Sequence, residues 1–341
     1  MAPMRVLLAP DKFAGTLSAV EAAAAIAAGW SRSAPGDVLD LAPLSDGGPG
    51  FVDVLHDALG GRLIPVAVEG PLGAAVLGAV LVVGDVAYVE ASQACGLHLV
   101  AVEARDPLAA STRGVGSLLL AALESGATRV VVGVGGTAST DGGRGAVETL
   151  GRDWPAGVDL VVATDVDTPL LGPMGAAEVF GPQKGATPGQ VAELEARLTA
   201  WAADRGTDPD LPGAGAGGGL AYGLLTLSGR RAPGIDTVLD AIGLNARVAA
   251  ADLVVTGEGA FDFQSLRGKV PAGVAARARA AGRPCLVLAG RVDAGRREAA
   301  AAGIDAAYAV VDLVGVEAAL ADPSARLADL AADVASQWSR G

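Results

Sequence analysis

The segment "RVLLAPDKFAGTLSAVEAA", residues 5–23, contains a strand pattern, a polar loop and a helix start in immediate succession. The apolar run at residues 5–9 predicts a buried strand. Ser18, followed by Glu21 three positions later, predicts a capping box that opens an alanine-rich helix. A second strand at residues 38–42 leads into another helix, which we expect to end near Gly60 and Gly61. This part of the chain therefore predicts two βα units.

The C-terminal part of the chain repeats this alternation. It predicts strands at 252–256, 284–289 and 306–311 and helices at 270–281, 296–302 and from Pro323 onward. If the two ends of the chain fold together, the five strands form a parallel sheet of flavodoxin-like order, 2-1-3-4-5. We therefore expect an α/β protein with a discontinuous domain, residues 1–62 and 245–341, and a large inserted mixed α/β domain, residues 63–244.

The middle of the chain has a different pattern. Short apolar runs at 64–68, 76–83 and 87–90 are separated by Gly-Pro and Gly-Asp, which favours hairpins. Further on, the sequence predicts helices at 116–124 and 188–205, strands at 129–132 and 159–163, and a glycine-rich turn at 213–219 that is either a linker or a close-packing turn. These elements predict a mixed sheet covered by helices.

Composition and charge exclude several classes of protein. The 341 residues include 25 Lys and Arg against 38 Asp and Glu, a net charge of -13, which disfavours nucleic acid and anionic membrane as partners. No apolar run is long enough to span a bilayer and no signal-like start is evident, so we expect a cytoplasmic protein. The only two histidines, His56 and His98, lack metal-ligand spacing, and Cys95 and Cys285 form no CxxC motif.

A DGGxG motif occurs twice, each time between a predicted strand and a predicted helix. The first copy lies in "SDGGPG", residues 45–50, and the second in "GVGGTASTDGGRG", residues 133–145. Each copy predicts an anion site made by backbone amides at a helix start, or else a tight turn without a ligand. The candidate phosphate or substrate contacts are Asp46, Gly47, Gly48, Ser139, Thr140, Asp141, Gly142 and Gly143.

Acidic and basic side chains at other strand ends suggest further chemistry. Asp165 and Asp167 follow a predicted strand two positions apart, so they suit Mg²⁺ or a substrate hydroxyl, or else form a solvated loop. Lys184 and Lys269 each lie beside a glycine and could contact phosphate, or be surface lysines. A further group lies after the first and third strands of the parallel sheet, where such sheets bind ligands: Asp11, Lys12, Glu258 and Asp262.

Several segments together resemble the bacterial glycerate kinase family. They are "APDKFAGTLSAVEAA", "SDGGPG", "GVGGTASTDGGRGA", "ATDVDTPLLGP", "AAEVFGPQKGA", "GAGGGLAYGL", "ADLVVTGEG" and "DFQSLRGKVPAGVA", and they span most of the chain in order. The resemblance implies ATP-dependent, Mg²⁺-assisted phosphorylation of D-glycerate to 2- or 3-phosphoglycerate in an interdomain cleft. It also implies ligand contacts from Gln264 and Ser265.

Specific roles follow as hypotheses from this resemblance. Asp165 or Asp167 accepts the proton of the substrate hydroxyl or holds Mg²⁺, and Lys184 acts with them in catalysis. Lys12, Lys184 and Lys269 contact phosphate or carboxylate. The sequence leaves open which domain holds ATP, which hydroxyl reacts, and whether the protein is a monomer or a homodimer.

The sequence also departs from the family at three positions, Ala14, Pro49 and Ala260, each of which lacks a side chain that could contact a ligand. One alternative is therefore a noncatalytic nucleotide- or hydroxyacid-binding protein, and another is a kinase of a related hydroxyacid. A nicotinamide oxidoreductase is suggested by the glycines at 133–136. It is disfavoured because the third glycine of the GxGxxG motif is displaced and the expected downstream acidic residue is missing.

Overall fold

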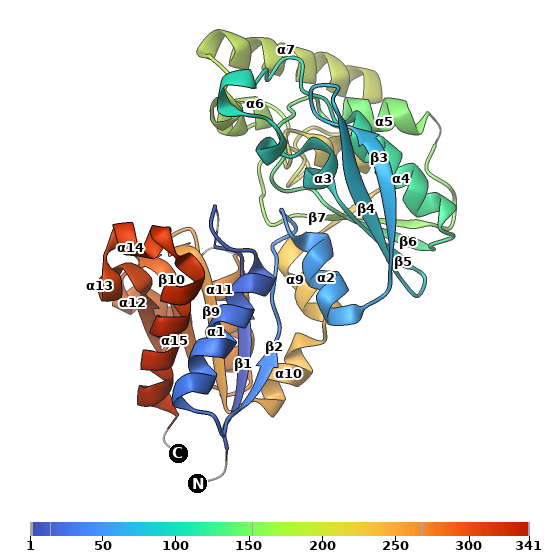
Figure 1. The fold of residues 1–341 in the computed structure, drawn as a ribbon. Coiled ribbons are helices and arrows are strands. Elements are labelled where there is room, and N and C mark those ends of the chain that lie inside the picture. Colours follow the sequence, from blue (N-terminus) through green and yellow to red (C-terminus); the bar gives the residue numbers. More distant parts are fainter. Residues whose placement is uncertain (1–2, 14, 152, 267–268, 340–341) are drawn as a thin grey trace. The chain divides into compact units, whose positions relative to one another are not determined.

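The computed structural model describes residues 3–13, 15–151, 153–266 and 269–339. The chain divides into two compact units, each built around its own sheet (Figure 1). Unit 1 comprises the residues up to Asp46, Asp53–Ala58 and the residues from Ile235 onward, and unit 2 comprises Gly47–Val52 and Leu59–Gly234. The domain boundaries expected from the sequence, after residues 62 and 244, remain a prediction about independently folding domains.

Unit 1 contains a parallel sheet of five strands in the described residues, in the order β11-β10-β9-β1-β2. Its strands are β1 (Arg5–Pro10), β2 (Val38–Leu41), β9 (Leu253–Phe261), β10 (Cys285–Val292) and β11 (Ala306–Ala309). Because β9, β10 and β11 are the third, fourth and fifth strands of the predicted sheet, this order confirms the predicted 2-1-3-4-5 arrangement. The N-terminal strand β1 thus lies between β2 and β9, as expected for two chain ends that fold together.

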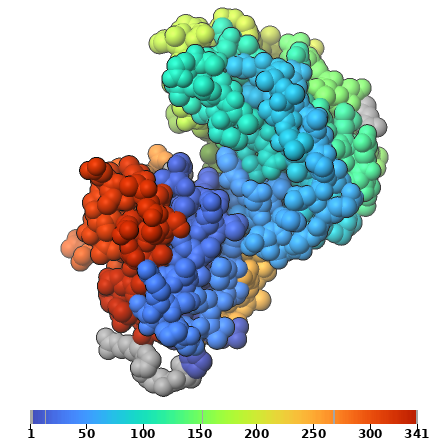
Figure 2. All heavy atoms as spheres, viewed as in Figure 1, coloured from blue at the N-terminus to red at the C-terminus, as the bar shows by residue number. Residues whose placement is uncertain are grey.

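Helices cover both the N-terminal and C-terminal strands of unit 1. They are α1 (Ala19–Ser33), α9 (Gly234–Ala241), α10 (Leu244–Ala250), α11 (Val270–Ala280), α12 (Arg296–Ala301), α13 (Val310–Val314), α14 (Val316–Ala321) and α15 (Pro323–Trp338), while α2 (Phe51–Leu59) carries residues of both units. The predicted capping box is present, since the Ser18 hydroxyl accepts from the Glu21 amide and the Glu21 carboxylate accepts from the Ser18 amide. Figure 2 shows the red C-terminal segment packed against the blue N-terminal segment.

The core of unit 1 lies between the sheet and the pair of helices α1 and α15. Val6, Leu8, Val255 and Leu288 point from three neighbouring strands into this core, and all four are fully buried. Trp30 of α1 is also fully buried, and its indole N–H donates to Asp37 at 2.9 Å. A large aromatic side chain is therefore accommodated without an unsatisfied donor.

Two predicted boundaries in unit 1 are wrong. Residues 257–261, expected to form a loop after the third strand, continue β9, and residues 310–311, expected to end the fifth strand, begin α13. The glycines that suggest a loop have another cause, because a Cβ atom on Gly257 would overlap the carbonyl oxygen of Leu288 in the neighbouring strand. Glycine is needed here for close approach of two strands, so strand pairing prevails over turn propensity.

Unit 2 contains a mixed sheet, as the sequence predicts. In the described residues the order is β3-β4-β5-β6-β7-β8, with antiparallel pairing from β3 to β5 and parallel pairing from β5 to β8. The strands are β3 (Arg62–Glu69), β4 (Ala75–Val83), β5 (Val86–Glu90), β6 (Arg129–Gly133), β7 (Asp159–Ala163) and β8 (Arg230–Ala232). The predicted hairpins are confirmed, and the short strand β8 is the one strand of this sheet that the sequence did not predict.

The helices of unit 2 are α3 (Ala91–Cys95), α4 (Arg113–Glu124), α5 (Arg144–Leu150), α6 (Ala176–Phe180), α7 (Pro188–Arg205) and α8 (Leu220–Leu225), and three 3₁₀ turns lie at Leu97–Leu99, Val102–Ala104 and Pro182–Lys184. The bounds of α7 match the prediction, and a capping box between Thr187 and Gln190 opens it. Within the part of the chain that the structure describes, no helix combines the length and the apolarity needed to cross a membrane.

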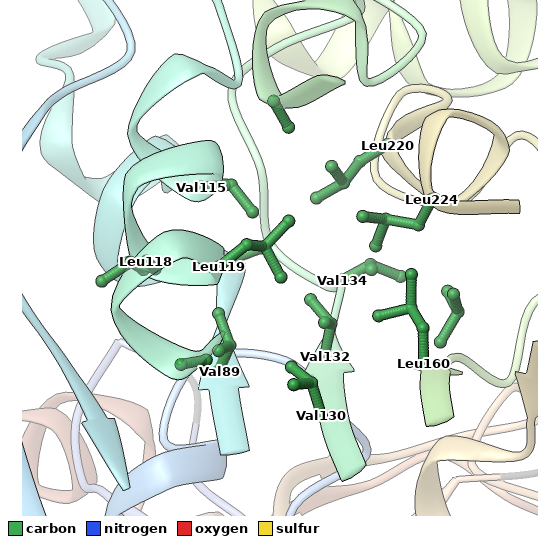
Figure 3. Packing of buried hydrophobic residues seen from close by; sticks show 14 of the residues in the cluster. Val89, Val115, Leu118, Leu119, Val130, Val132, Val134, Leu160, Leu220 and Leu224 are labelled. Atoms are coloured by element: carbon green, nitrogen blue, oxygen red, sulfur yellow. The ribbon is translucent and has the colours of Figure 1, made fainter. Parts of the chain in front are cut away.

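The largest core of unit 2 lies where α4 and α8 pack on the sheet (Figure 3). Val130 and Val132 of β6 point toward Leu119 of α4, and Leu220 and Leu224 of α8 extend the cluster toward β7. All five side chains are fully buried. The alternate residues of β6 thus hold α4 and α8 over the strand ends from which the polar loops of this unit emerge.

The glycine-rich segment 213–219 is a close-packing turn rather than a linker. Its amides and carbonyls approach the loop that follows β6: a Cβ atom on Gly217 would lie 2.6 Å from the carbonyl oxygen of Val134, and one on Gly219 would lie 2.7 Å from the Cα of Gly142. The amide of Gly142 donates to the carbonyl of Gly218 at 3.1 Å. Only residues without a side chain allow two backbones to approach this closely.

Gly29→Ala tests the packing of α1 on α15. Alanine normally stabilises a helix interior by about 1 kcal/mol relative to glycine. At Gly29, however, a Cβ atom would overlap the carbonyl oxygen of Ala328 in α15. We expect Gly29→Ala to lower the free energy of unfolding by roughly 1–3 kcal/mol because the helices must move apart, as measured by denaturant unfolding. Gly36→Ala is the matched control, since a Cβ atom there meets open space; equal stability of the two variants would contradict the packing argument.

Candidate functional site

Three chain segments meet at the carboxyl edge of the sheet in unit 1. The amide of Asp11 donates to the carbonyl of Gly257 at 2.8 Å, and the amide of Leu44 donates to the carbonyl of Pro10 at 2.9 Å. The hydroxyl of Thr256 donates to the carbonyl of Ala9 at 2.8 Å. The loop after β1 is therefore tied to β9 on one side and to the segment after β2 on the other.

These ties assemble a carboxylate cluster, which we define as Asp11, Lys12, Asp46 and Glu258. The Lys12 ammonium lies 3.6 Å from Asp11 Oδ1 and 3.3 Å from Asp46 Oδ1, so it neutralises two carboxylates that come from different strand ends. Burial raises the pKa of Asp11 to about 6; the charge of Lys12 opposes this rise and that of Asp46 adds to it. One lysine thus holds a partly buried group of acids in place, and any cation or proton donor added here would be attracted.

Glu258 is the acid of this cluster that lacks a complete set of partners. It lies on β9, only 6% exposed, and in the described residues no hydrogen-bond donor reaches its Oε1 atom. Burial raises its pKa to about 7; the Ser265 hydroxyl and the Lys269 ammonium lower it, and the charge of Asp11 raises it further. A buried carboxyl group whose pKa lies near neutrality can hold or release a proton at working pH, as is common at functional sites.

The segment after β9 leads from Glu258 to the start of α11. Asp262 Oδ1 accepts from the amides of Gln264 at 2.8 Å and Ser265 at 3.2 Å, and the Ser265 hydroxyl accepts from the amide of Asp262 at 3.0 Å. Ser265 is fully buried, whereas Gln264 is exposed. Lys269 is the N-cap residue of α11. At a helix start, a positive charge and the helix amides both favour an anion.

In unit 2, the second DGGxG motif differs from the predicted anion site. The carboxylate of Asp141 itself accepts from the amides of Gly143 at 3.1 Å and Gly145 at 3.2 Å, and the amide of Gly142 is bonded to Gly218. Asp141 Oδ2 also accepts from the amide and the hydroxyl of Thr112, both at 2.9 Å. The amides at this helix start are therefore not free for an external anion, because the motif supplies its own.

The first DGGxG motif has the same property, with a carboxylate from elsewhere in unit 2. Glu90, at the end of β5 and 3% exposed, accepts from the amides of Gly50 and Val52, each at 3.2 Å. The hydroxyl of Ser92 donates to its other oxygen. The sequence analysis missed Glu90, although an acidic residue directly after an otherwise apolar buried strand is a recognisable signal. The amides of Gly50 and Val52 are thus bonded to a protein acceptor, as are those of Gly142, Gly143 and Gly145.

A lysine cluster, which we define as Thr137, Ser139, Thr140 and Lys184, lies beside the second motif. Lys184 is 3% exposed, and its ammonium donates to the Thr137 hydroxyl at 3.3 Å and to the carbonyl of Ser139. Burial lowers the pKa of Lys184 to about 8, while Cys95 and Asp141 raise it. An ammonium carries three donors, so a buried lysine with two acceptors can bind one more.

Two of the three hydroxyls in the lysine cluster, those of Ser139 and Thr140, are also available for a ligand. Ser139 Oγ and Thr140 Oγ1 are buried and have no hydrogen-bond partner among the described residues. Thr140 and Asp141 also line a cavity of about 360 Å³, together with Arg144, Arg197 and Trp201. Buried hydroxyls are costly to leave unpaired, so their presence next to a buried ammonium favours a small polar anion as ligand.

In the acidic pair after β7, Asp167 has a defined ion-pair partner. The strand ends at Ala163, and Asp167, whose side chain is 81% exposed, forms an ion pair of 2.7 Å with Arg231. Arg231 was not among the residues predicted from the sequence, because it lies on β8, far from Asp167 along the chain. In the described residues, no group of three or more His, Cys, Asp or Glu side chains is placed to hold a metal ion.

The three positions that depart from the family pattern have different surroundings. Pro49 packs in unit 2, where a Cβ atom on Gly136 would lie 2.7 Å from its ring. Ala260 lies on β9, two residues after Glu258, at the edge of a cavity in unit 1. Ala14 is outside the described residues. The glycines Gly47 and Gly48 of the first motif are buried, and the carbonyl of Gly47 accepts from the amide of Gly135 at 3.2 Å.

Comparison with known proteins identifies one family. The sequence model of the glycerate kinase family matches residues 6–155 and 152–339. A glycerate kinase from Bacillus subtilis is 41% identical over 345 residues, which cover 90% of this chain and 90% of the relative. A glycerate 2-kinase from Escherichia coli is 37% identical over 349 residues, with 92% of each chain covered.

A solved structure shares the fold. The crystal structure described as "putative glycerate kinase 2 from Salmonella typhimurium LT2" matches with a TM-score of 0.80 and 36% sequence identity. The match covers 98% of this chain and 98% of that one. Both units described above are therefore present in that relative.

Glu258→Gln tests the burial of this carboxyl group through the pH dependence of stability. The pKa of Glu258 is about 7 in the folded protein against 4.5 ordinarily, so between these values the folded state binds more protons than the unfolded state. The wild type therefore loses stability as pH rises through this window. Relative to wild type, Glu258→Gln should gain roughly 2–3 kcal/mol in free energy of unfolding between about pH 5 and pH 8.

The measurement is denaturant unfolding at several pH values. Glu317→Gln, at an exposed position of α14, is the matched control and should follow the wild-type profile. Parallel profiles for wild type and Glu258→Gln would show that this carboxyl group is ionised in the folded protein as in the unfolded one.

Proposed function

The chain belongs to the glycerate kinase family, and we propose that it transfers the γ-phosphoryl group of ATP to a hydroxyl group of D-glycerate. The observation that carries this proposal is the match of the family over nearly the whole chain. The matched residues include both the carboxylate cluster and the lysine cluster. The protein is accordingly a kinase.

Phosphoryl transfer depends on positioning and on neutralising the charge of the phosphates. We propose that Lys12 and Lys269 of unit 1 contact phosphate. Lys12 follows the carboxyl end of β1, and Lys269 is the N-cap residue of α11. In unit 2, the Lys184 ammonium and the unpaired hydroxyls of Ser139 and Thr140 suit the carboxylate and hydroxyls of glycerate. Lysines from separate segments can thus neutralise the phosphates, whereas in phosphate-binding loops of the GxxxxGK[ST] type a single lysine of the motif does so.

The proton of the reacting hydroxyl needs an acceptor, which we propose to be Asp165. Asp167 is the weaker candidate, because its carboxylate is already neutralised by Arg231. A carboxylate within hydrogen-bond reach of a substrate hydroxyl acts as a general base and contributes about 10²–10⁴-fold to the rate.

Mg²⁺ is proposed as the metal that accompanies ATP. This ion is usually held by one or two carboxylates and by the substrate phosphates, so it does not need three protein ligands. The carboxylates of Asp11 and Asp46, which flank one ammonium, fit this requirement, as does Asp165. When bound, the ion would neutralise negative charge on the phosphates.

For the product we propose 2-phosphoglycerate, on the ground that the relative from Escherichia coli is named glycerate 2-kinase. The test is ADP release by the purified protein with ATP, Mg²⁺ and D-glycerate, alongside L-glycerate and related hydroxyacids. Added enolase should convert the product directly, because enolase acts on 2-phosphoglycerate. Conversion that requires added phosphoglycerate mutase would identify the 3-phosphate, and turnover only with another hydroxyacid would identify a different acceptor. ATP binding without turnover of any acceptor would contradict the kinase proposal.

Asp165→Asn should lower kcat about a hundredfold or more, since the amide cannot accept the proton. Asp167→Asn, whose carboxylate is paired with Arg231, should have a smaller effect. Asp153→Asn, at an exposed position of the same unit, is the control and should leave kcat unchanged. The measurement is initial ADP release at saturating ATP and D-glycerate. Equal rates for Asp165→Asn and Asp153→Asn would remove Asp165 from the mechanism.

A further inference from the structure

A cavity of about 370 Å³ lies at the carboxyl edge of the sheet in unit 1. It is bounded by the end of β1, by β9 and β10, and by the three helices that follow β11. Its lining residues are Phe13, Thr16, Gly259, Ala260, Gly290, Arg291, Val310, Val311, Val316, Ala319, Leu320, Pro323 and Leu327. Cavities that bind small molecules in other proteins have volumes of about 300–1,000 Å³, so this one is large enough for a ligand.

Most of the cavity wall is apolar. Phe13 is 3% exposed and forms part of the core, but Val316 and Leu320 of α14 are 62% and 64% exposed. When an apolar ligand covers aliphatic side chains that are otherwise exposed to water, their burial contributes favourably to the free energy of binding. The wall formed by α14 is therefore suited to a flat, largely apolar group.

Another part of the cavity wall is formed by residues of β9 and β10. β10 extends to Val292, whereas its pairing with β11 covers only Leu286–Ala289 in the described residues, so Gly290 and Arg291 project beyond β11. A Cβ atom on Gly290 would lie 2.5 Å from the carbonyl oxygen of Gly259, which explains why β10 carries glycine at this position. Gly259 and Gly290 offer peptide groups close to the cavity without side chains that would fill it, and Arg291 adds a cationic side chain to the lining.

The cavity lies next to the carboxylate cluster, because two residues that line the cavity directly follow residues of the cluster in the sequence. Phe13 directly follows Lys12, and Gly259 directly follows Glu258, so the Cα atoms at each of these steps lie about 3.8 Å apart. Lys12 and Arg291 are cationic, and Glu258 Oε1 is buried without a donor in the described residues. An apolar cavity thus passes into a region with cations for phosphate and an acceptor for a hydroxyl group.

We infer that this cavity holds the adenine base of ATP, so that unit 1 is the nucleotide-binding unit. This inference rests on the proposed function, which requires ATP. The base packs between Phe13 on one side and Val316 and Leu320 on the other, with its polar edge toward the peptide groups of Gly290 and Arg291. The ribose then lies toward Glu258, and the phosphates toward Lys12.

Leu320→Asp tests the base site with little risk to folding, because the side chain is mostly exposed. A carboxylate in the cavity should disfavour the apolar base, raising the KM for ATP and the Kd of ATP about tenfold or more. The KM for D-glycerate and the affinity for inorganic tripolyphosphate, which lacks the base, should change much less. Leu313→Asp is the matched control, since this exposed leucine of α13 does not line the cavity.

A second measurement uses the wild-type protein, so it does not depend on a variant. Photolabelling with 2-azido-ATP should modify peptides of α14 or of residues 259–260 and 290–291, and an excess of ATP should prevent this labelling. Labelling confined to unit 2, or an unchanged KM and Kd for ATP in Leu320→Asp, would overturn the assignment while leaving the kinase activity intact. Conversely, wild-type protein that binds ATP at this site without phosphorylating any hydroxyacid would refute the proposed function and uphold the inference.

Discussion

The pairing of β1 with β9 is the interaction on which unit 1 depends. It joins residues 247 positions apart, as in the hydrogen bond from the Thr256 hydroxyl to the carbonyl of Ala9. Closing so long a loop costs entropy, which the buried strands and the helices α1 and α15 must offset. The same pairing brings Asp11 beside Glu258. The fold and the carboxylate cluster therefore have a common origin, and disruption of the pairing would remove both.

Burial of charge is a second constraint that both units share. Asp11, Glu258 and Lys184 are all buried, and in each case the pKa moves toward neutrality because water is excluded. Such groups are costly for stability unless they are paired. Lys12 compensates two carboxylates in unit 1, and Lys184 is held by a hydroxyl and a carbonyl oxygen in unit 2. The remaining open atoms, Glu258 Oε1 and the hydroxyls of Ser139 and Thr140, are where a substrate would complete the network.

The two DGGxG motifs illustrate how similar sequences are satisfied in different ways. In one, Asp141 of the motif caps its own helix start, and in the other, Glu90 arrives from β5 to accept from the amides of Gly50 and Val52. A motif indicates a backbone conformation with exposed amides, but it does not identify their acceptor. In unit 2, the buried polar atoms without a partner in the described residues thus belong to side chains beside the motif, those of Ser139 and Thr140, rather than to the amides of Gly142, Gly143 and Gly145.

Local patterns in the sequence were sufficient for the capping box at Ser18, the bounds of α7, the hairpins of unit 2 and the parallel order of the sheet in unit 1. These features depend on residues close in sequence, or on rules of chain connection that hold for βα units generally. Only the tertiary structure decided that residues 257–261 continue a strand, that Asp141 and Glu90 occupy helix-start amides, and that Arg231 pairs with Asp167. Each of these outcomes depends on a partner distant in the sequence, and no local pattern records how close two distant backbones approach or how much water remains between them.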